Sequence, residues 1–356
     1  MRVAVVGLGA AGSAALRFVA QAGHQAVGFE QFRIGHTRGS SHGESRIYRL
    51  TYPDPFYTRL MREALPLWHA LEQAAGEELM VRCGVLWLGK ENDAELQQIM
   101  QSLQQENAPF EILTPADIER RFPAIRLYSG ECALFQADGG FLRASACVQA
   151  NIRLAVQAGA QLREQTRVQG LEPAGACIAL HLSDGTTERF DRVILTAGAW
   201  LPKLLPQLSL PLTVTRQVYA YFALRQHAER FDPTRLPVWI EAGTHFYGFP
   251  ADGRQAGIKI AQHMLGEIHD PDHEAHPADE RDLQPLREWI RFRLPDLDET
   301  VLYAATCLYT NTPDEHFLMA HLPGEPRVWY LSACSGHGFK FSILMGKRVA
   351  EAAIHS

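Results

Sequence analysis

Residues 2–30 read RVAVVGLGAAGSAALRFVAQAGHQAVGFE, and this stretch decides the expected fold. The apolar run 2–6 is typical of a strand buried on both faces. The glycine-rich segment 7–12 follows it, and residues 13–21 then have the composition of a helix. A second short strand ends in the acid Glu30. The order of strand, glycine turn, helix, strand and acid is typical of a dinucleotide site.

Each glycine of the turn has a mechanical role. Gly7 permits the tight turn, Gly9 lets backbone N–H groups approach a pyrophosphate, and Gly12 lets the helix pack against the strand. The helix N-terminus presents the positive end of its dipole to the phosphates. Glu30 can accept hydrogen bonds from an adenosine ribose.

A secretory signal peptide cleaved near Ala20 is the competing interpretation of the same segment. A signal peptide has no use for the second strand, 25–29, or for the acid that ends it, so we favour the dinucleotide site. Elsewhere no window holds about twenty uninterrupted apolar residues, the length that a membrane-spanning helix needs.

The composition bounds the class of protein. With 356 residues, of which 46% are hydrophobic, the chain is long enough for two domains around a large buried core. The net charge of −6 argues against a nucleic-acid-binding surface, which normally carries a basic excess. The cysteines are scattered without a Cys-x-x-Cys pair, which argues against a disulfide framework and a zinc site. We therefore expect a cytoplasmic protein without a bound metal.

A second apolar strand far along the chain indicates an interrupted domain. Residues 191–200 (DRVILTAGAW) have the pattern of a buried parallel strand that ends in small residues. A nicotinamide-binding half would not need it, whereas a flavin-binding domain interrupted by a second domain would. The segments 212–222, 238–247 and 257–263 alternate, as in a separate sheet. We expect a discontinuous nucleotide domain, 1–78, 141–213 and 318–356, and a substrate domain, 79–140 and 214–317.

Other periodic segments complete the two domains. The expected helices cover 55–76, 93–107, 144–158, 279–293 and 341–353, and another helix begins at Thr114. The expected strands cover 84–89, 131–136, 161–171, 178–182 and 328–332.

Three polar segments carry candidate functional residues. Residues 36–49 (HTRGSSHGESRIYR) predict a loop leading into a helix, on which Arg46 and Arg49 would share one face. An isolated pair would be a solvated basic face, but beside a nucleotide loop we expect it to face an anion or an electron-rich ring. Lys259 and His263, four apart in a strand, would face the same side.

Lys259 and His263 differ in what each would indicate on its own. A buried lysine is rare unless it is paired or functional, whereas an isolated His263 would be a core histidine. The third segment, 334–340 (CSGHGFK), joins the last strand to the terminal helix. Its glycines make the start of that helix a candidate anion-binding position.

Five motifs follow one another along nearly the whole chain: the glycine start at 7–12, GSSHGESRIYR at 39–49, K-x-x-x-H at 259–263, CLYTNTPDEHF at 307–317 and GHGFK at 336–340. Together they resemble the family of monomeric sarcosine oxidase and N-methyltryptophan oxidase, within the D-amino-acid-oxidase-like flavoproteins. A lone G-x-G-x-x-G is weak evidence, but the combination in this order is highly specific.

The resemblance implies an α/β flavoprotein, α+β overall, with two domains. A Rossmann-like FAD domain is interrupted by a mainly antiparallel β-sheet substrate domain with helices. The cofactor implied is FAD, attached covalently at its 8α-methyl through Cys307, although a lone cysteine is usually an inert buried thiol. The resemblance also implies a monomer whose partners are a small secondary amino acid and O₂, with neither nucleic acid nor a membrane.

The reaction implied is a two-electron amine oxidation, whose chemistry belongs largely to the cofactor. The C–H beside the substrate nitrogen delivers a hydride equivalent to flavin N5, the imine is hydrolysed, and O₂ reoxidises the flavin to give hydrogen peroxide. Expected substrates are N-methyl or cyclic secondary amino acids such as sarcosine, N-methyltryptophan, proline or pipecolate. An N-methyl substrate yields formaldehyde plus an amino acid.

The family's pattern also implies roles for single residues. Arg49 and Lys340 hold the substrate carboxylate, Lys259 near N5 favours electron transfer to O₂, and Tyr247 and His263 bind the amine. The implied catalytic residues are Lys259, His263, Arg49, Lys340, Tyr247 and Tyr309. The implied cofactor-binding residues are Gly7, Gly9, Ala10, Ala11, Gly12, Glu30, Gln31, His36, Ser40, His42, Arg46, Ile47, Val168, Ala197, Gly198, Trp200, Cys307, Gly336, His337, Gly338, Phe339 and Lys340.

Two alternatives stay open at this point. A dehydrogenase would pass electrons to an acceptor other than oxygen, which Lys259 disfavours and peroxide release would exclude. A flavin-binding protein without turnover would need none of the substrate-side cations Arg49, Lys259 and Lys340.

Overall fold

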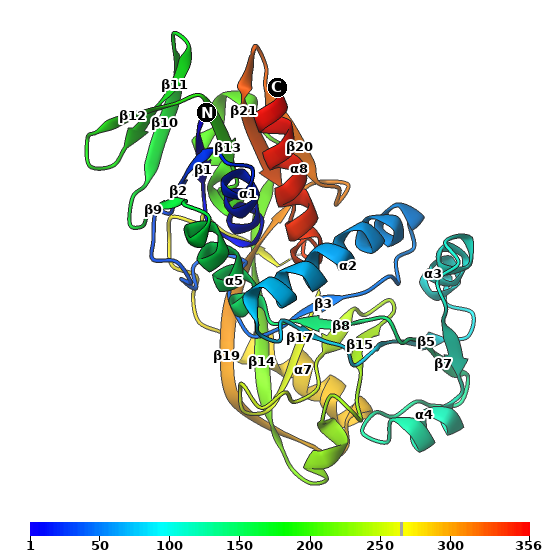
Figure 1. Cartoon of the computed structure of the whole chain (residues 1–356). Helices are drawn as coiled ribbons and strands as arrows, with labels where there is room; N and C mark the ends of the chain where they lie inside the picture. Colours follow the sequence, from blue (N-terminus) through cyan, green and yellow to red (C-terminus); the bar gives the residue numbers. More distant parts are fainter. Residues whose placement is uncertain (264–265) are drawn as a thin grey trace.

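The computed structural model describes residues 1–263 and 266–356. Among these residues, a six-stranded sheet has the order β20-β21-β13-β1-β2-β9. Its strands are β1 (Arg2–Val6), β2 (Gln25–Phe29), β9 (Gln161–Arg163), β13 (Arg192–Leu195), β20 (Leu318–Leu322) and β21 (Glu325–Ser332). All pairings are parallel except that of β20 with β21. The chain therefore leaves this sheet and returns to it, as Figure 1 shows.

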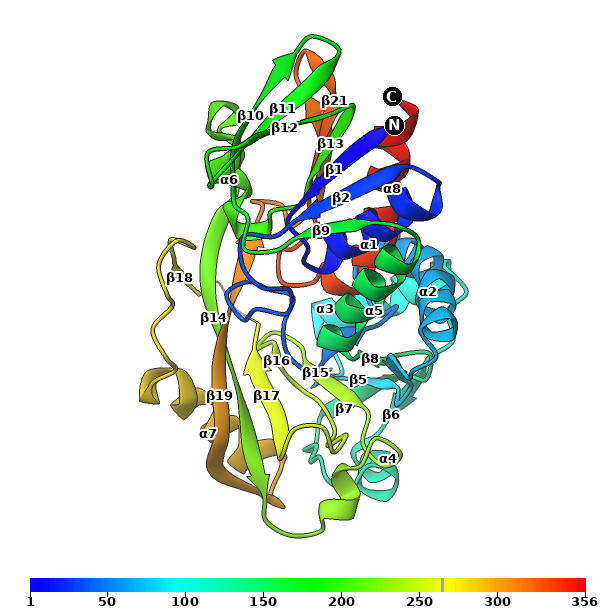
Figure 2. The same ribbon diagram turned by 60° about the vertical axis from the view of Figure 1, so that its left-hand side comes forward.

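This sheet is covered on both faces, as expected for the apolar run 2–6. Val3 and Val5 enter one core with the helices, whereas Ala4 and Val6 enter another with the small sheet. The helical layer consists of α1 (Ala10–Gln21), α2 (Pro55–Ala75), α5 (Ala144–Gln157) and α8 (Ser342–His355) (Figure 2). The small sheet consists of β10 (Val168–Ala174), β11 (Cys177–Leu182) and β12 (Thr187–Phe190).

A second sheet of nine strands, within the described residues, has the order β18-β14-β17-β16-β15-β5-β7-β6, with β19 also paired to β14. Its pairings are antiparallel except that of β15 with β5. The strands are β5 (Val85–Lys90), β6 (Glu111–Leu113), β7 (Glu131–Gln136), β14 (Thr213–Leu224), β15 (Val238–Glu241), β16 (Phe246–Gly248), β17 (Ile258–Gln262), β18 (Glu267–Ile268) and β19 (Leu297–Asn311).

Helices pack around the second sheet. Trp289 of α7 (Glu280–Arg293) stacks on Trp239 of β15, with ring centroids 6.1 Å apart. The helices α3 (Ala94–Gln105) and α4 (Pro115–Arg121) lie at the end of the sheet formed by β5 and β7 (Figure 1). Between the two large sheets lies a small one of β3 (Arg46–Tyr48), β4 (Met80–Val81) and β8 (Gly140–Leu142). Shorter pieces are α6 (Leu201–Leu204) and single 3₁₀ turns at Gly198–Trp200, Pro206–Leu208, Ala228–Phe231 and Phe339–Phe341.

The structure confirms the predicted fold class, a parallel sheet between two layers combined with a mainly antiparallel sheet. Two local predictions were wrong. Residues 46–48 form strand β3, not a helix, because they pair with β8, Arg46 opposite Leu142. The predicted strand 161–171 is two strands in different sheets, since β9 pairs with β2 and β10 with β11.

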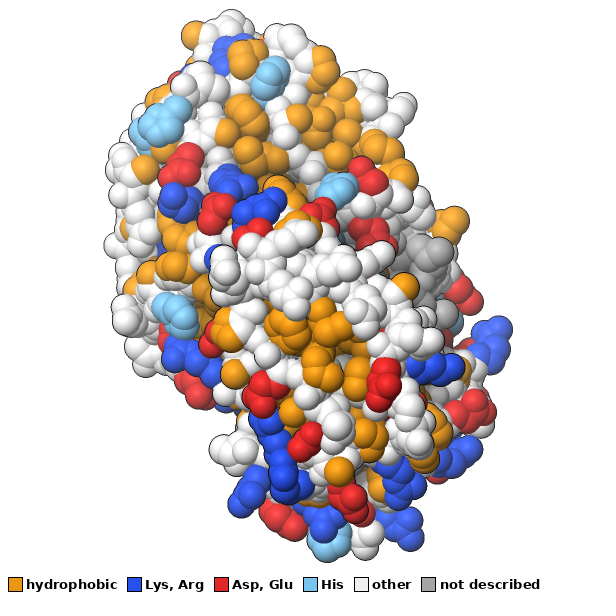
Figure 3. Space-filling view, turned by 90° about the vertical axis from the view of Figure 1, so that its right-hand side faces the viewer, with side chains coloured by type: hydrophobic (Ala, Val, Ile, Leu, Met, Phe, Trp, Pro, Cys, Tyr) orange, Lys and Arg blue, Asp and Glu red, His pale blue; other side chains and the backbone are white. Residues whose placement is uncertain are grey.

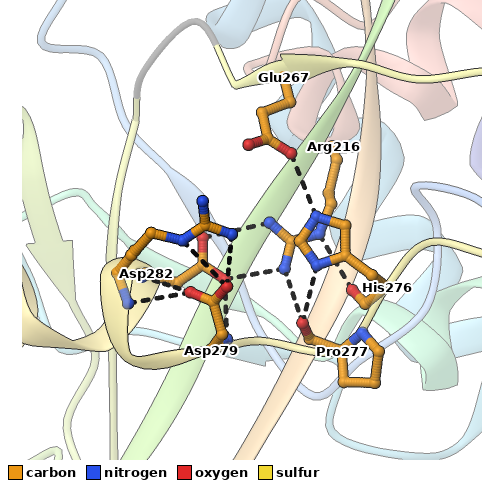
Figure 4. A network of polar contacts seen from close by, with 7 residues as sticks. Arg216, Glu267, His276, Pro277, Asp279 and Asp282 are labelled. Atoms are coloured by element: carbon orange, nitrogen blue, oxygen red, sulfur yellow. Dashed lines mark hydrogen bonds and ion pairs between the residues drawn. The ribbon is translucent and has the colours of Figure 1, made fainter.

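Polar contacts hold the segment after β18 against β14 (Figure 4). The buried Arg216 guanidinium donates to the Asp282 carboxylate, 2.8 Å away, and to the carbonyl oxygens of His276 and Pro277. The next residue of β14, Gln217, pairs with Cys307 of β19. The network therefore fixes the strand that supports Cys307.

The surface carries charges of both signs. Lys and Arg side chains lie beside Asp and Glu side chains across the face drawn in Figure 3, with hydrophobic side chains between them. In the described part of the chain, no helix is both long enough and apolar enough to cross a membrane.

Candidate active site

The carboxyl ends of the parallel strands open onto a cavity of about 640 Å³, the place where open α/β sheets bind ligands. The first sheet supplies the glycine turn and the ends of β2, β13 and β21 to its walls. Among the residues that the second sheet supplies are Tyr247 of β16, Lys259 of β17, His263 directly after β17, and Cys307 and Tyr309 of β19. The cavity is therefore shared by the two sheets.

Backbone geometry explains the glycine turn. Gly7 has φ +90°, in the left-handed region that favours glycine. A Cβ on Gly12 would lie 1.8 Å from the Gly7 carbonyl oxygen, so the helix packs on the turn only with glycine there. Ser41 Oγ accepts the Ala10 N–H at 2.9 Å and so caps the start of α1. The buried Glu30 carboxylate accepts the N–H of Leu8 in this turn and the N–H of Phe32 in the loop after β2.

His42 of the loop before β3 and Arg46, the first residue of β3, both line the cavity. Arg46 donates to the carbonyl oxygens of Ser40, His42 and Ser45 at 2.8–2.9 Å, which fixes the loop around its guanidinium. Burial, followed by the charge of Arg46, lowers the pKa of His42 to about 3, so this imidazole is neutral. Its Nε2 is buried and has no hydrogen-bond partner among the described residues. An orphaned polar atom at a cavity wall points to a ligand group there.

Lys259 and Cys307 face the same part of the cavity. Lys259 as a residue is 3% exposed, and its ammonium donates to the Ser45 carbonyl oxygen at 3.0 Å and lies 4.5 Å from the centroid of the Tyr219 ring. Burial, then the charge of Arg46, lowers its pKa well below the ordinary lysine value. Burial raises the pKa of the Cys307 thiol, whereas Arg46 and Lys259 lower it.

Arg49 and Lys340 are two cations at the other end of the cavity. The Lys340 ammonium is buried and donates to Tyr52 Oη and to the His337 carbonyl oxygen, each at 2.8 Å. Arg49, which faces the cavity, bonds to the Thr51 carbonyl oxygen and lies 3.8 Å from the Tyr52 ring centroid. Burial lowers the pKa of both groups. In the described part of the chain neither cation forms an ion pair with a carboxylate.

His263 and two tyrosines lie near these cations. His263 Nδ1 is 3.4 Å from Tyr309 Oη, and a Cβ on Gly336 would come within 2.3 Å of His263 Cε1, so glycine lets the last loop pack on both rings. Burial, then the charge of His245, lowers the pKa of His263 to about 4, so its imidazole is neutral near pH 7. Burial raises the pKa of Tyr247 to about 12.

The structure brings the predicted residues together. All six predicted catalytic residues line the cavity, and so do the predicted cofactor-binding residues except Gly12 and Gly338. Those two act through packing instead, because a Cβ on Gly338 would lie 1.8 Å from the Ala333 carbonyl oxygen. The sequence reasoning missed further lining residues: Ser41, Tyr52, Trp87, Glu95 and His245. Of these five, only Ser41 lay within a quoted motif that could have marked it.

Within residues 1–263 and 266–356, no three His, Cys, Asp or Glu side chains are grouped so that they could hold a metal ion.

Comparisons with known proteins bear on this cavity. A family model described as FAD dependent oxidoreductase matches residues 2–352. The chain is 35% identical to monomeric sarcosine oxidase of Streptomyces avermitilis, over 99% of the chain and 93% of that protein. It is 31% identical to N-methyl-L-tryptophan oxidase of Yersinia pestis, over 97% of the chain and 93% of that protein.

Solved structures agree with these relatives. The open form of NikD, described as an unusual amino acid oxidase essential for nikkomycin biosynthesis, is similar with a TM-score of 0.88 and 28% identity, covering 99% of this chain and 93% of that one. An L-proline dehydrogenase from P. horikoshii has a TM-score of 0.82, 19% identity and coverage of 98% and 92%, which shows a likeness of fold alone.

Proposed function

The chain belongs to the family of FAD-dependent oxidoreductases, and from this premise we propose that it oxidises N-methyl or cyclic secondary amino acids, with O₂ as electron acceptor. Its relatives named sarcosine oxidase and N-methyl-L-tryptophan oxidase support an N-methyl amino acid as substrate. In the proposed reaction an imine is hydrolysed and hydrogen peroxide is released.

One observation carries the proposal: Arg49 and Lys340 are cations that face the cavity without a carboxylate partner in the described part of the chain. Charges withdrawn from water are costly unless they are paired. A substrate carboxylate supplies the missing partner, and the Arg49 guanidinium suits its geometry. An amino acid fits this end of the cavity better than a simple amine does.

The residues at the other end fit FAD. The glycine turn leaves room for a pyrophosphate at the start of α1, Glu30 lies at the ribose position, and the orphaned Nε2 of His42 can meet a polar group of the ring system. When bound, FAD supplies the acceptor for the hydride equivalent leaving the C–H beside the substrate nitrogen. We include covalent attachment through the Cys307 sulfur in the proposal, since Cys307 lines the cavity and the charges of Arg46 and Lys259 offset part of the rise in its pKa that burial causes.

His263, Tyr247 and Lys259 contribute hydrogen bonds and a positive charge to the proposed reaction. The neutral His263 can accept a hydrogen bond from the substrate N–H, and the Tyr247 hydroxyl stays protonated and can donate. The charge of Lys259 favours electron transfer to O₂, because it stabilises the negative charge that develops on oxygen. The proposal keeps the domain division expected from the sequence: 1–78, 141–213 and 318–356 for the nucleotide domain, and 79–140 with 214–317 for the substrate domain.

The test begins with the purified protein and its visible spectrum. Sarcosine, N-methyltryptophan, proline and pipecolate are each mixed with it without oxygen, and bleaching of the flavin band is followed. The proposal expects bleaching by at least one of them and, in air, one peroxide per substrate oxidised. Bleaching without peroxide would point to a dehydrogenase, and failure of every secondary amino acid to bleach the band would refute the proposed substrate class.

The covalent bond between the flavin and Cys307 is tested separately, by precipitating the protein in acid. A yellow pellet that becomes colourless in Cys307→Ala supports the covalent bond. Cys334→Ala is the matched control, because Cys334 also lines the cavity and should leave the pellet yellow. A yellow supernatant with wild-type protein would remove Cys307 as the attachment site and leave FAD binding intact.

A further inference from the structure

A charged pair at the substrate end of the cavity, Glu95 and His245, has no part in the function proposed above. His245 Nε2 lies 3.0 Å from Glu95 Oε2, which also accepts the backbone N–H of Gly243 at 3.3 Å. Both side chains are partly exposed, His245 by 38% and Glu95 by 27%. The pair joins the first turn of α3 to the turn 242–245 between β15 and β16.

The backbone of His245 is unusual and firmly held. Its φ of +55° lies in the left-handed region that residues other than glycine rarely adopt. Its N–H bonds to the carbonyl oxygen of Glu241 at 2.8 Å, and the buried Glu241 carboxylate pairs with Arg293. Strained residues that the surrounding structure holds in place cluster at functional sites. The turn is thus a rigid support rather than a loose loop.

This support touches His263 directly. The His263 backbone N–H donates to the His245 carbonyl oxygen at 3.0 Å, and the centroids of the two imidazole rings are 6.2 Å apart. On its other side, His263 Nδ1 faces Tyr309 Oη. Backbone and ring of His263 therefore both depend on the place of His245.

Several charged groups face the two histidines. Four of them act on His263, each from a different segment of the chain. His245, Arg49 and Lys340 lower its pKa, and Glu95 raises it. Burial is the main cause that lowers the pKa of His337, and His263 adds a smaller lowering. Those that act on His245 are Glu95, which raises its pKa through their hydrogen bond, Glu315, which also raises it, and Arg49, which lowers it. The imidazole bonded to Glu95 is the one favoured to carry a proton.

Resting on the proposed function, in which His263 faces the substrate amine, we infer that Glu95 and His245 are positioning residues that act through His263. The pair fixes the backbone of His263 and presents a positive charge to its ring. His263 then takes up a second proton only in acid and remains a hydrogen-bond acceptor for the substrate N–H. Neither Glu95 nor His245 needs to touch the reacting atoms for this role.

His245→Asn is the discriminating variant. Asparagine tolerates the left-handed region and carries no charge, and its shorter side chain gives up the hydrogen bond that His245 Nε2 makes with Glu95. Histidine labelled with ¹³C at Cε1 gives one NMR titration curve per ring, and His263→Asn identifies the curve of His263. We expect the pKa of His263 to rise by about 0.5–1 pH unit in His245→Asn. The acid limb of kcat/KM for the best N-methyl substrate should move by the same amount.

His227→Asn is the matched control. His227 also has a left-handed φ, +53°, and lies 3.5 Å from a glutamate, Glu229, but it does not line the cavity. This variant should leave the titration of His263 unchanged. His245→Arg restores a positive charge at the turn and should bring the pKa of His263 back down, and Glu95→Gln should lower the pKa of His245.

The inference is overturned if His263 titrates alike in wild type, His245→Asn and His245→Arg, or if His227→Asn shifts it equally. Failure of the proposed function is a different result, since then no secondary amino acid bleaches the wild-type flavin. The NMR titrations need no turnover, so they decide the role of the pair in either case.

Discussion

Lys340→Met is expected to weaken the binding of an amino acid substrate while leaving the free energy of unfolding nearly unchanged. In wild type the ammonium is buried, donates to Tyr52 Oη and the His337 carbonyl oxygen, and has no carboxylate partner in the described chain. Burial, followed by the charge of Arg49, lowers its pKa well below the usual lysine value. The free enzyme therefore holds a costly charge at a place where a substrate carboxylate would be stabilised.

The magnitudes follow from this arrangement. Removing one partner of a buried, hydrogen-bonded charge pair costs about 2–5 kcal/mol. Because 1.36 kcal/mol is a tenfold change in rate, kcat/KM for an N-methyl amino acid should fall by roughly 30- to 5,000-fold. Replacing buried ionic groups by apolar side chains of similar volume is neutral or stabilises by about 1–4 kcal/mol, whereas loss of the bonds to Tyr52 and to the His337 carbonyl oxygen costs ~1 kcal/mol each. The free energy of unfolding should therefore change by no more than about 2 kcal/mol in either direction.

The assay compares two substrates in two variants. Peroxide release is measured with sarcosine and with dimethylamine, which lacks the carboxylate, and unfolding is followed in urea. Lys347→Met is the control, because Lys347 lies on the surface of α8 in a pair with Glu351. The reasoning is refuted if Lys340→Met slows sarcosine and dimethylamine equally, or if it lowers the free energy of unfolding by several kcal/mol.

Three further outcomes can be measured. Gly12→Ala places a Cβ 1.8 Å from a backbone carbonyl oxygen of the glycine turn and should abolish FAD binding. In the control Gly39→Ala the added Cβ makes only ordinary contacts, so this variant should still bind FAD. The ratio of FAD to protein after desalting measures both outcomes. Arg293→Met leaves the buried Glu241 carboxylate without its cation and should cost about 3–5 kcal/mol in urea unfolding. The pKa of Lys259 is held well below 10.5, so between its folded value and 10.5 the unfolded chain binds more protons than the folded one. The free energy of unfolding should therefore rise with pH over that interval, and Lys259→Met should flatten the rise.

Backbone conformation was predictable from the sequence wherever residues adjacent in the chain determine it. The turn 7–12 and the strand before it need only the backbone freedom of glycine and an apolar run, and the structure has both as expected. The conformation of residues 46–48 was not predictable, since it follows from pairing with β8, a strand distant in the sequence. Glu95 and His245 were missed for the same reason: each is ordinary in its own segment, and only the packing of α3 against the turn 242–245 brings them together.

The place of Cys307 shows why the site needs both sheets. The loop at 39–42, which follows the nucleotide strands, bonds to β19 next to the cysteine: Ser40 Oγ donates to the Leu308 carbonyl oxygen, and the Gly39 carbonyl oxygen accepts the Leu308 N–H. On its other edge β19 pairs with β14, which Arg216 anchors. Neither sheet alone fixes the distance between the glycine turn and the thiol. Under the proposed attachment through Cys307, a change that loosens β14 should therefore slow that attachment even where the nucleotide turn is intact.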